Sequence, residues 1–73
     1  MNTHTKEITI ITEYIELQQL LKKANLISSG GETKVFLAEN KIIVDGVEEN
    51  RRGKKLYPGT VVEIFGVEYH IKK

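Results

Sequence analysis

The spacing of apolar residues changes at Lys41 from a helical period to a period of two, and this change limits the possible folds more than any other feature. In the segment 17–24, before this change, apolar residues recur at the three- and four-residue intervals of a helix: Leu17, Leu20, Leu21 and Ala24. After Lys41 the period is two, as in strands that bury one face. Helical spacing followed by a run of strands predicts an α+β domain.

The first helix is predicted over residues 16–24, and Asn25 is a plausible stop. Leu26 and Ile27 follow this stop, and we expect them to pack into the core. Their apolar side chains would then close the end of the helix against the rest of the domain.

The second helix is predicted to start at about Gly30 and to run to about Glu39. Its start is marked by Ser29 followed three residues later by Glu32, which matches a capping box. Three apolar or small residues share one face of this helix and are expected to face the core, while Val35 points away from it. These three are Thr33, Phe36 and Leu37.

Five strands are predicted, one before the helices and four after them. They cover residues 8–12, 42–44, 47–48, 61–65 and 67–71. Asp45-Gly46 suits a tight type I′ turn, Pro58-Gly59 marks another turn, and Gly66 separates the last two strands. The sequence therefore predicts two short helices packed on one side of a small, strongly twisted, mostly antiparallel sheet.

The length and composition are those of one soluble domain. A core in a chain of 73 residues gives only marginal stability, and the 40% apolar and 29% charged fractions are ordinary for a globular chain. The chain has no cysteine, so neither a disulfide nor a thiolate metal site is available. No apolar run approaches the roughly 18–20 residues that span a bilayer, and the first residues lack the apolar stretch of a signal peptide. We therefore expect a cytoplasmic, monomeric protein without a membrane partner.

Positive charge is concentrated in one short stretch, although the formal net charge is only +1. The stretch holds four cations in five positions: Arg51, Arg52, Lys54 and Lys55. Such a patch can bind phosphates because its field is local, and an arginine can donate two parallel hydrogen bonds to a phosphate. Gly53 allows the backbone to bend between the cations. The alternative is a solvated loop that Glu48 and Glu49 partly neutralise.

Two other groups of residues could extend this basic patch. The segment 28–31, Ser-Ser-Gly-Gly, leaves backbone N–H groups bare at a predicted helix start, where the helix dipole favours anions. The alternative is a flexible turn with a good cap. Lys22, Lys23 and Lys34 flank or oppose the apolar helix faces, so they form a shared basic surface or simply solubilise the protein.

The three tyrosines are candidates for stacking on unpaired bases. Tyr69 alternates with Val67 and Ile71, so core packing is the better interpretation there. Tyr57 adjoins the basic stretch and is the tyrosine to test, whereas Tyr14 has no such neighbour in the sequence.

The sequence offers little for catalysis. His4 and His70 are not part of any His-Cys-carboxylate arrangement with metal-ligand spacing, and the single aspartate, Asp45, is committed to a turn. No nucleophile has a recognisable base partner. We therefore expect no enzyme activity, no metal and no other cofactor.

Residues 15–65 together resemble the αL RNA-binding motif, the domain known from the small-subunit ribosomal protein S-four. The matching segments are IELQQLLK (15–22), SGGETK (29–34), VDG (44–46), ENRRGKKL (49–56) and PG (58–59). The motif recurs in tyrosyl-tRNA synthetases, pseudouridine synthases and a ribosome-rescue heat-shock protein. The chain looks most similar to small stand-alone bacterial members described as YaaA-like. A single RNA-binding domain over residues 1–73, with its core motif at 15–65, is therefore expected.

This resemblance implies that the two helices and the adjoining loop grip structured RNA through its backbone. Carried over by match, the candidate contacts are Ser29, Gly30, Lys34, Arg51, Arg52, Lys54 and Lys55, with Lys22 and Lys23 as secondary candidates. Four positions depart from the usual pattern, at caps and turns more than on the basic surface. They are Glu16 for a capping Thr or Ser, Thr33 for Ala, Asn40 for Gly and Thr60 for Asp.

The expected function is non-catalytic binding of structured RNA (ribosomal RNA, transfer RNA or another folded RNA) by shape and phosphate contacts with little reading of bases. The resemblance implies a role in ribosome assembly, quality control or translation, with the ribosome or one of its subunits as a partner. Two alternatives stay open: an adaptor whose basic loop binds an acidic protein partner, and a nonspecific DNA-binding protein. A ubiquitin-like carrier is disfavoured because the chain ends in Ile71-Lys72-Lys73 rather than Gly-Gly.

Overall fold

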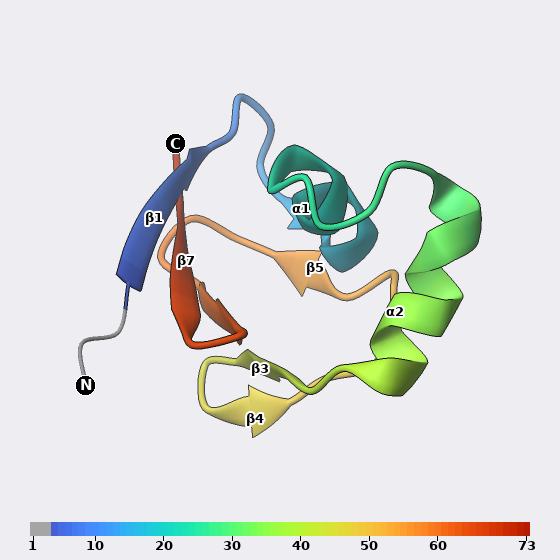
Figure 1. Ribbon diagram of the computed structural model, residues 1–73. Coiled ribbons are helices and arrows are strands. Elements are labelled where there is room, and N and C mark those ends of the chain that lie inside the picture. The colour runs from blue at the N-terminus through green and yellow to red at the C-terminus, as the bar shows by residue number, and fades with distance from the viewer. Residues whose placement is uncertain (1–3) are drawn as a thin grey trace.

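A five-stranded sheet and two short helices form the main layers of the computed structural model, which describes residues 4–73 (Figure 1). The strands in spatial order are β1 (His4–Thr9), β7 (Val67–Lys72), β6 (Val61–Ile64), β3 (Ile42–Val44) and β4 (Val47–Glu48). β1 and β7 run parallel, and every other neighbouring pair is antiparallel. The predicted α+β class and the mostly antiparallel sheet are therefore confirmed.

A second, two-stranded sheet was not predicted. It pairs β2 (Ile15–Glu16) with β5 (Lys55–Leu56) in antiparallel register. Each strand has only two residues, which is too short for a period-two pattern to be visible in the sequence. This small sheet carries the chain directly into the first helix and out of the basic stretch, so it matters for the site.

Both predicted helices are present. α1 (Leu17–Lys23) buries three leucines completely and is followed by Asn25, whose φ of 59° is the left-handed conformation that asparagine tolerates at a helix end. The second helix begins with a 3₁₀ turn, η1 (Gly30–Glu32), and continues as α2 (Thr33–Glu39). α2 buries Thr33 and Leu37 and leaves Val35 exposed, as the apolar spacing predicts.

One hydrophobic core joins α1, the interhelical segment, α2 and both sheets. α1 contributes its leucines, the segment after it contributes Ile27, and β5 contributes Leu56, which is fully buried. Tyr69 in β7 is also buried, which confirms that it belongs to the core. Because Leu56 and α1 belong to the same core, the residues just before Leu56 must lie close to α1.

The hairpin turns follow from local residue chemistry. Asp45 and Gly46 both have positive φ, at 48° and 84°, as a type I′ turn requires. Phe65 and Gly66 do the same between β6 and β7, with φ of 54° and 76°. Turn chemistry therefore fixes both hairpins where the sequence predicts them.

The first strand lies earlier in the chain than predicted. A strand over 8–12 was expected, but β1 ends at Thr9, opposite Lys72 in the register with β7. Ile10 is buried and its N–H donates to the Lys72 carbonyl at 2.8 Å, whereas Ile11 is 94% exposed. The pairing with β7, which lies far away in sequence, decides where this strand ends, and apolar content alone gave the wrong bounds.

The cap at the start of the second helix also differs from the prediction. Ser29 makes no side-chain capping bond, and Ser28, one residue earlier, bonds to Glu32 instead. Its hydroxyl donates to Glu32 Oε1 at 2.5 Å and its N–H donates to Oε2 at 3.2 Å. The 3₁₀ turn accounts for this shift, because it changes the spacing between the serine and the carboxylate.

Three of the four departures from the family pattern have visible partners. The Glu16 N–H donates to Gln19 Oε1 at 2.8 Å at the start of α1, and Asn40 Nδ2 donates to the Phe36 carbonyl at 3.0 Å at the end of α2. Thr60 Oγ1 accepts the Tyr57 N–H at 3.3 Å. These side chains therefore satisfy backbone groups at the caps and the turn.

Candidate nucleic-acid interface

The basic loop, residues 51–55, is attached to the start of α1 by backbone hydrogen bonds. The Leu17 N–H donates to the Lys54 carbonyl at 2.8 Å, and the Gln18 N–H donates to the Arg52 carbonyl at 3.0 Å. The β2–β5 pairing continues the same contact outward. The first N–H groups of a helix have no partner within the helix, and here the loop supplies one. The course of the loop is therefore fixed by α1.

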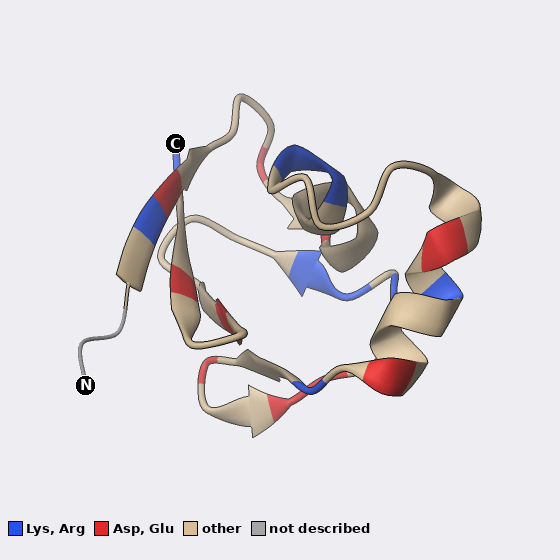
Figure 2. Ribbon diagram, in the orientation of Figure 1, with Lys and Arg blue, Asp and Glu red and all other residues tan. Residues whose placement is uncertain are grey.

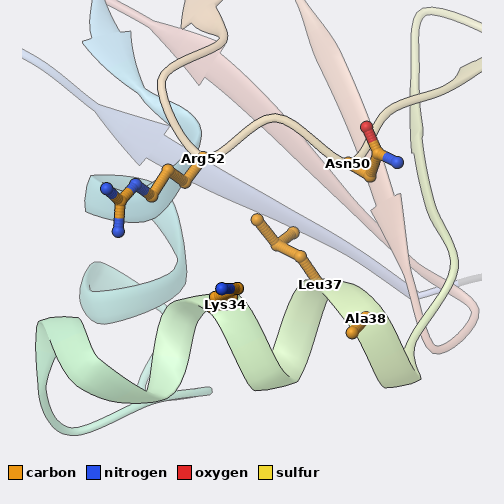
Figure 3. A pocket seen from close by; sticks show the side chains of 5 residues that line it. All are labelled: Lys34, Leu37, Ala38, Asn50 and Arg52. Carbon is orange, nitrogen blue, oxygen red and sulfur yellow. The ribbon is translucent and has the colours of Figure 1, made fainter.

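A hollow of about 500 Å³ lies between this loop and α2 (Figure 3). Lys34 approaches it from α2 and Arg52 from the loop, and the Arg52 guanidinium points toward α1. Leu37 and Ala38 contribute its apolar wall, and Asn50 stands at its other end. Lys34 and Arg52, which are distant in the sequence, thus line one concave surface. An extended anion could contact both cations there.

Asn50 was not among the predicted site residues. It lies in the ENRRGKKL segment, directly before the two arginines, so the motif itself was the available signal. Its amide can donate and accept hydrogen bonds, which makes it a neutral polar neighbour to the two cations.

Arg51 and Arg52 have different surroundings although they are adjacent in sequence. The Arg51 guanidinium donates to both carboxylate oxygens of Glu49, at 2.8 and 3.1 Å, and the Arg51 N–H also donates to this carboxylate. The Glu49 side chain is only 10% exposed, compared with 71% for Arg51. The charge of Arg51 is therefore balanced within the loop.

The same pair shifts two pKa values. The side-chain hydrogen bond from Arg51 lowers the pKa of Glu49 to about 2, against the smaller opposing effect of burial. This bond in turn raises the pKa of Arg51. Glu49 is thus ionised at any physiological pH and holds Arg51 in place, so the expectation that a nearby glutamate neutralises part of the patch is fulfilled at this residue.

Three other loop cations have no such partner. Within residues 4–73, no carboxylate lies within 4.0 Å of the charged groups of Arg52, Lys54 or Lys55. Lys54 and Lys55 line a second hollow of about 550 Å³ together with Arg51, Gly53 and Tyr57. The Lys55 ammonium lies 5.0 Å from the centre of the Tyr14 ring, in a cation–π contact.

The interhelical segment brings Lys22 close to Gly30. A Cβ atom placed on Gly30 would lie 3.9 Å from Lys22 Nζ, so the end of α1 and the start of η1 are neighbours. Ser29 and Gly30 are exposed, while the Ser28 N–H already donates to Glu32. Hydrogen bonds from Ser28 lower the pKa of Glu32, so a carboxylate is already held at this turn.

Six cations that lie on the two helices and the basic loop therefore have no ion-pair partner in the described part of the chain (Figure 2). They are Lys22, Lys23, Lys34, Arg52, Lys54 and Lys55, here called the basic surface. Lys23 is exposed in the last turn of α1. Figure 2 shows the loop cations in the middle of this group, between the cations of α1 and the one of α2.

Metal-binding clusters and membrane-spanning helices are two further features to consider in residues 4–73. No three histidine, aspartate or glutamate side chains gather there in a way that would hold a metal ion. Neither helix in this part of the chain has the length and apolar character needed to cross a membrane.

A family model described as "S4 domain" matches residues 8–72, which is most of the chain. The chain belongs to the S4 domain family. The expected resemblance to the αL RNA-binding motif is therefore confirmed, and in this S4 domain the loop attached to α1 lies within the matched region.

Curated relatives of this S4 domain come from bacteria. The chain is 54% identical over 59 residues to "Probable ribosome maturation protein RlbA" of Bacillus subtilis (strain 168), covering 81% of this chain and 83% of that protein. It is 36% identical over 53 residues to "Putative RNA-binding protein YbcJ" of Escherichia coli (strain K12), covering 73% of this chain and 76% of that protein. Both relatives are thus matched over most of their length.

Proposed function

We propose that this S4 domain binds structured RNA without catalysing a reaction, through phosphate contacts made by the basic surface. The RNA would be ribosomal or transfer RNA, recognised mainly by shape and backbone. Arg52 and Lys34 would provide the central contacts, and Lys54 and Lys55 would extend them along the loop. Lys22, Lys23 and the exposed Ser29-Gly30 segment would form the outer edge.

The observation that carries this proposal is the attachment of the loop to α1. Because the Leu17 and Gln18 N–H groups hold the carbonyls of Lys54 and Arg52, the loop cations have a fixed position next to α2. Arg52 and Lys34 then line the same hollow and have no carboxylate partner among the described residues. A preformed group of cations avoids the ordering cost that a flexible loop would have on binding.

The names of the relatives support a place in ribosome biology. One relative is named as a ribosome maturation protein and another as an RNA-binding protein. We extend this to a role of the present chain in the assembly or maturation of a ribosomal subunit, with ribosomal RNA as the bound molecule. This extension agrees with a site that has cations for phosphates.

The test is a titration of the intact protein against three labelled polyanions: a transcribed ribosomal RNA fragment, duplex DNA of equal length and poly-glutamate. The proposal predicts the tightest binding to the RNA fragment, with an affinity that falls as salt rises. Equal affinity for DNA and RNA would indicate a nonspecific DNA-binding protein. Preferential binding to poly-glutamate would favour the adaptor, and either result would contradict the proposal.

A further inference from the structure

Two tyrosines from distant parts of the sequence meet beside the basic loop. Ile15 pairs with Leu56 in the β2–β5 sheet, and Tyr14 and Tyr57 are the next residues outward on each strand. Their ring centres lie 5.5 Å apart at an angle of 47°. Such a tilted contact is a favourable aromatic geometry, so each ring limits the movement of the other.

Tyr57 is held firmly but stays accessible. Its N–H donates to Thr60 Oγ1, its carbonyl accepts the Thr60 N–H at 3.0 Å, and the Gly59 N–H in the same turn donates to the Ile71 carbonyl at 2.8 Å. The residue is nevertheless 49% exposed. An aromatic ring that is fixed by its backbone and yet open to solvent can bind a flat ligand with little ordering cost.

The exposed ring of Tyr57 lines the same hollow as Lys54 and Lys55. The volume of about 550 Å³ falls within the range of small-ligand sites. A nucleotide has a flat apolar base next to a negatively charged phosphate, and this hollow offers an aromatic ring next to two cations. Phe65 is also exposed, but its ring packs against Phe36 and lines none of the basic hollows.

We propose that Tyr57, supported by Tyr14, stacks on one unpaired nucleobase of the bound RNA while Lys54 and Lys55 hold its flanking phosphate. This inference rests on the proposed RNA-binding function and adds a preference for RNA with an unpaired nucleotide beside a helix. The site reads the presence of a base and not its identity, because every base has a face that can stack.

The test compares three RNA duplexes that differ only at one end: blunt, with an unpaired adenosine overhang, and with an abasic overhang of equal charge. The wild-type protein should bind the adenosine overhang roughly tenfold more tightly than the abasic one, a typical stacking effect. Tyr57→Leu should remove this difference, whereas Tyr57→Phe should keep it. Phe65→Leu is the matched control, because it removes another exposed aromatic ring and should leave the preference unchanged.

A second measurement does not depend on any variant. A 2-aminopurine base in the overhang should lose fluorescence on binding the wild-type protein, because stacking quenches it. Equal wild-type affinity for the adenosine and abasic overhangs, or an unquenched 2-aminopurine, would overturn the stacking site. If the blunt duplex is then still bound in a salt-dependent way, the proposed function stands, and if no RNA is bound, both proposals fail.

Discussion

The sheet and the helix side of the molecule hold their charges in different ways. At β1 and β7, the Lys72 ammonium lies 3.3 Å from the Glu7 carboxylate, so opposite charges meet across the two strands, and His70 Nε2 lies 3.1 Å from Glu68 Oε1. On the helix side, the cations of the basic surface have no carboxylate partner within residues 4–73. Clustered like charges repel one another, which lowers the stability of the folded state. The comparison therefore indicates that Lys72 contributes to the contact between β1 and β7, whereas the six cations of the basic surface are available to an anion.

The largest expected effect is on the attachment of the loop. Leu56→Ala removes a fully buried side chain from β5, next to the loop, and should lower the free energy of unfolding by about 2–5 kcal/mol. Val47→Ala in the edge strand β4, where Val47 is 67% exposed, should change it by no more than about 0.5 kcal/mol. Urea denaturation measures both. Equal effects of the two truncations would show that β5 does not anchor the loop side of the domain.

The next largest effect is the difference in RNA affinity between removing cations of the basic surface and removing cations near β1 and β7. Lys34→Ala combined with Arg52→Ala removes two proposed phosphate contacts, which should weaken RNA binding at 0.1 M salt by roughly 25- to 60-fold and flatten the slope of log K against log salt by about 1.4–1.8. Lys6→Ala combined with Lys73→Ala removes the same charge from the β1 and β7 region. This control should bind RNA nearly as well as the wild type, and equal losses in both variants would mean that only net charge matters.

A smaller effect concerns Arg51, which behaves more like the paired charges of the sheet. Glu49→Gln keeps the shape of the acceptor but removes the charge that balances Arg51, so Arg51 could add one phosphate contact. RNA binding at 0.1 M salt should tighten by roughly five- to eightfold. Glu48→Gln is the matched control, since Glu48 makes no ion pair in the described structure. An unchanged affinity for Glu49→Gln would place Arg51 outside the RNA interface.

The smallest effect is a pH dependence of the free energy of unfolding, which comes from the ion pair between Glu49 and Arg51. The pKa of Glu49 is about 2 in the folded protein and near 4.5 without its partner, so this carboxylate stabilises the fold above pH 4.5 and loses that contribution as the pH falls toward 2. A carbon-13 NMR titration should show Glu49 titrating near pH 2. Arg51→Gln should return its pKa to the ordinary range. Glu49 titrating near pH 4.5 in the wild type would contradict the pairing.

Much of the fold follows from short-range sequence signals. The helical spacing of Leu17, Leu20 and Leu21, and the turns at Asp45-Gly46 and at Gly66, depend on neighbours a few residues apart and were predicted correctly. The strand predicted over 61–65 was one residue too long, because Phe65 belongs to the turn. The bounds of β1 and the β2–β5 sheet depend on partners more than thirty residues away, and local spacing carries no information about that register.

The candidate site likewise has one part that the sequence showed and one part that only the fold shows. The cations and the motif were visible in the sequence, and their assignment to RNA contacts stays a prediction. The different surroundings of Arg51 and Arg52 arise from the direction in which each side chain leaves the loop, and only the folded backbone sets these directions. The contact between Tyr14 and Tyr57 likewise depends on the unpredicted two-stranded sheet.

The central claim is that RNA binds to the helix side, which carries the basic surface, and not to the sheet side at β1 and β7. The most direct test is NMR mapping of the backbone amides as a structured RNA is added to the labelled protein. The account predicts that the signals that move belong to the start of α1, the basic loop and the first part of α2, while those of β1 and β7 stay in place. Shifts centred on β1 and β7, with the loop signals unmoved, would contradict it.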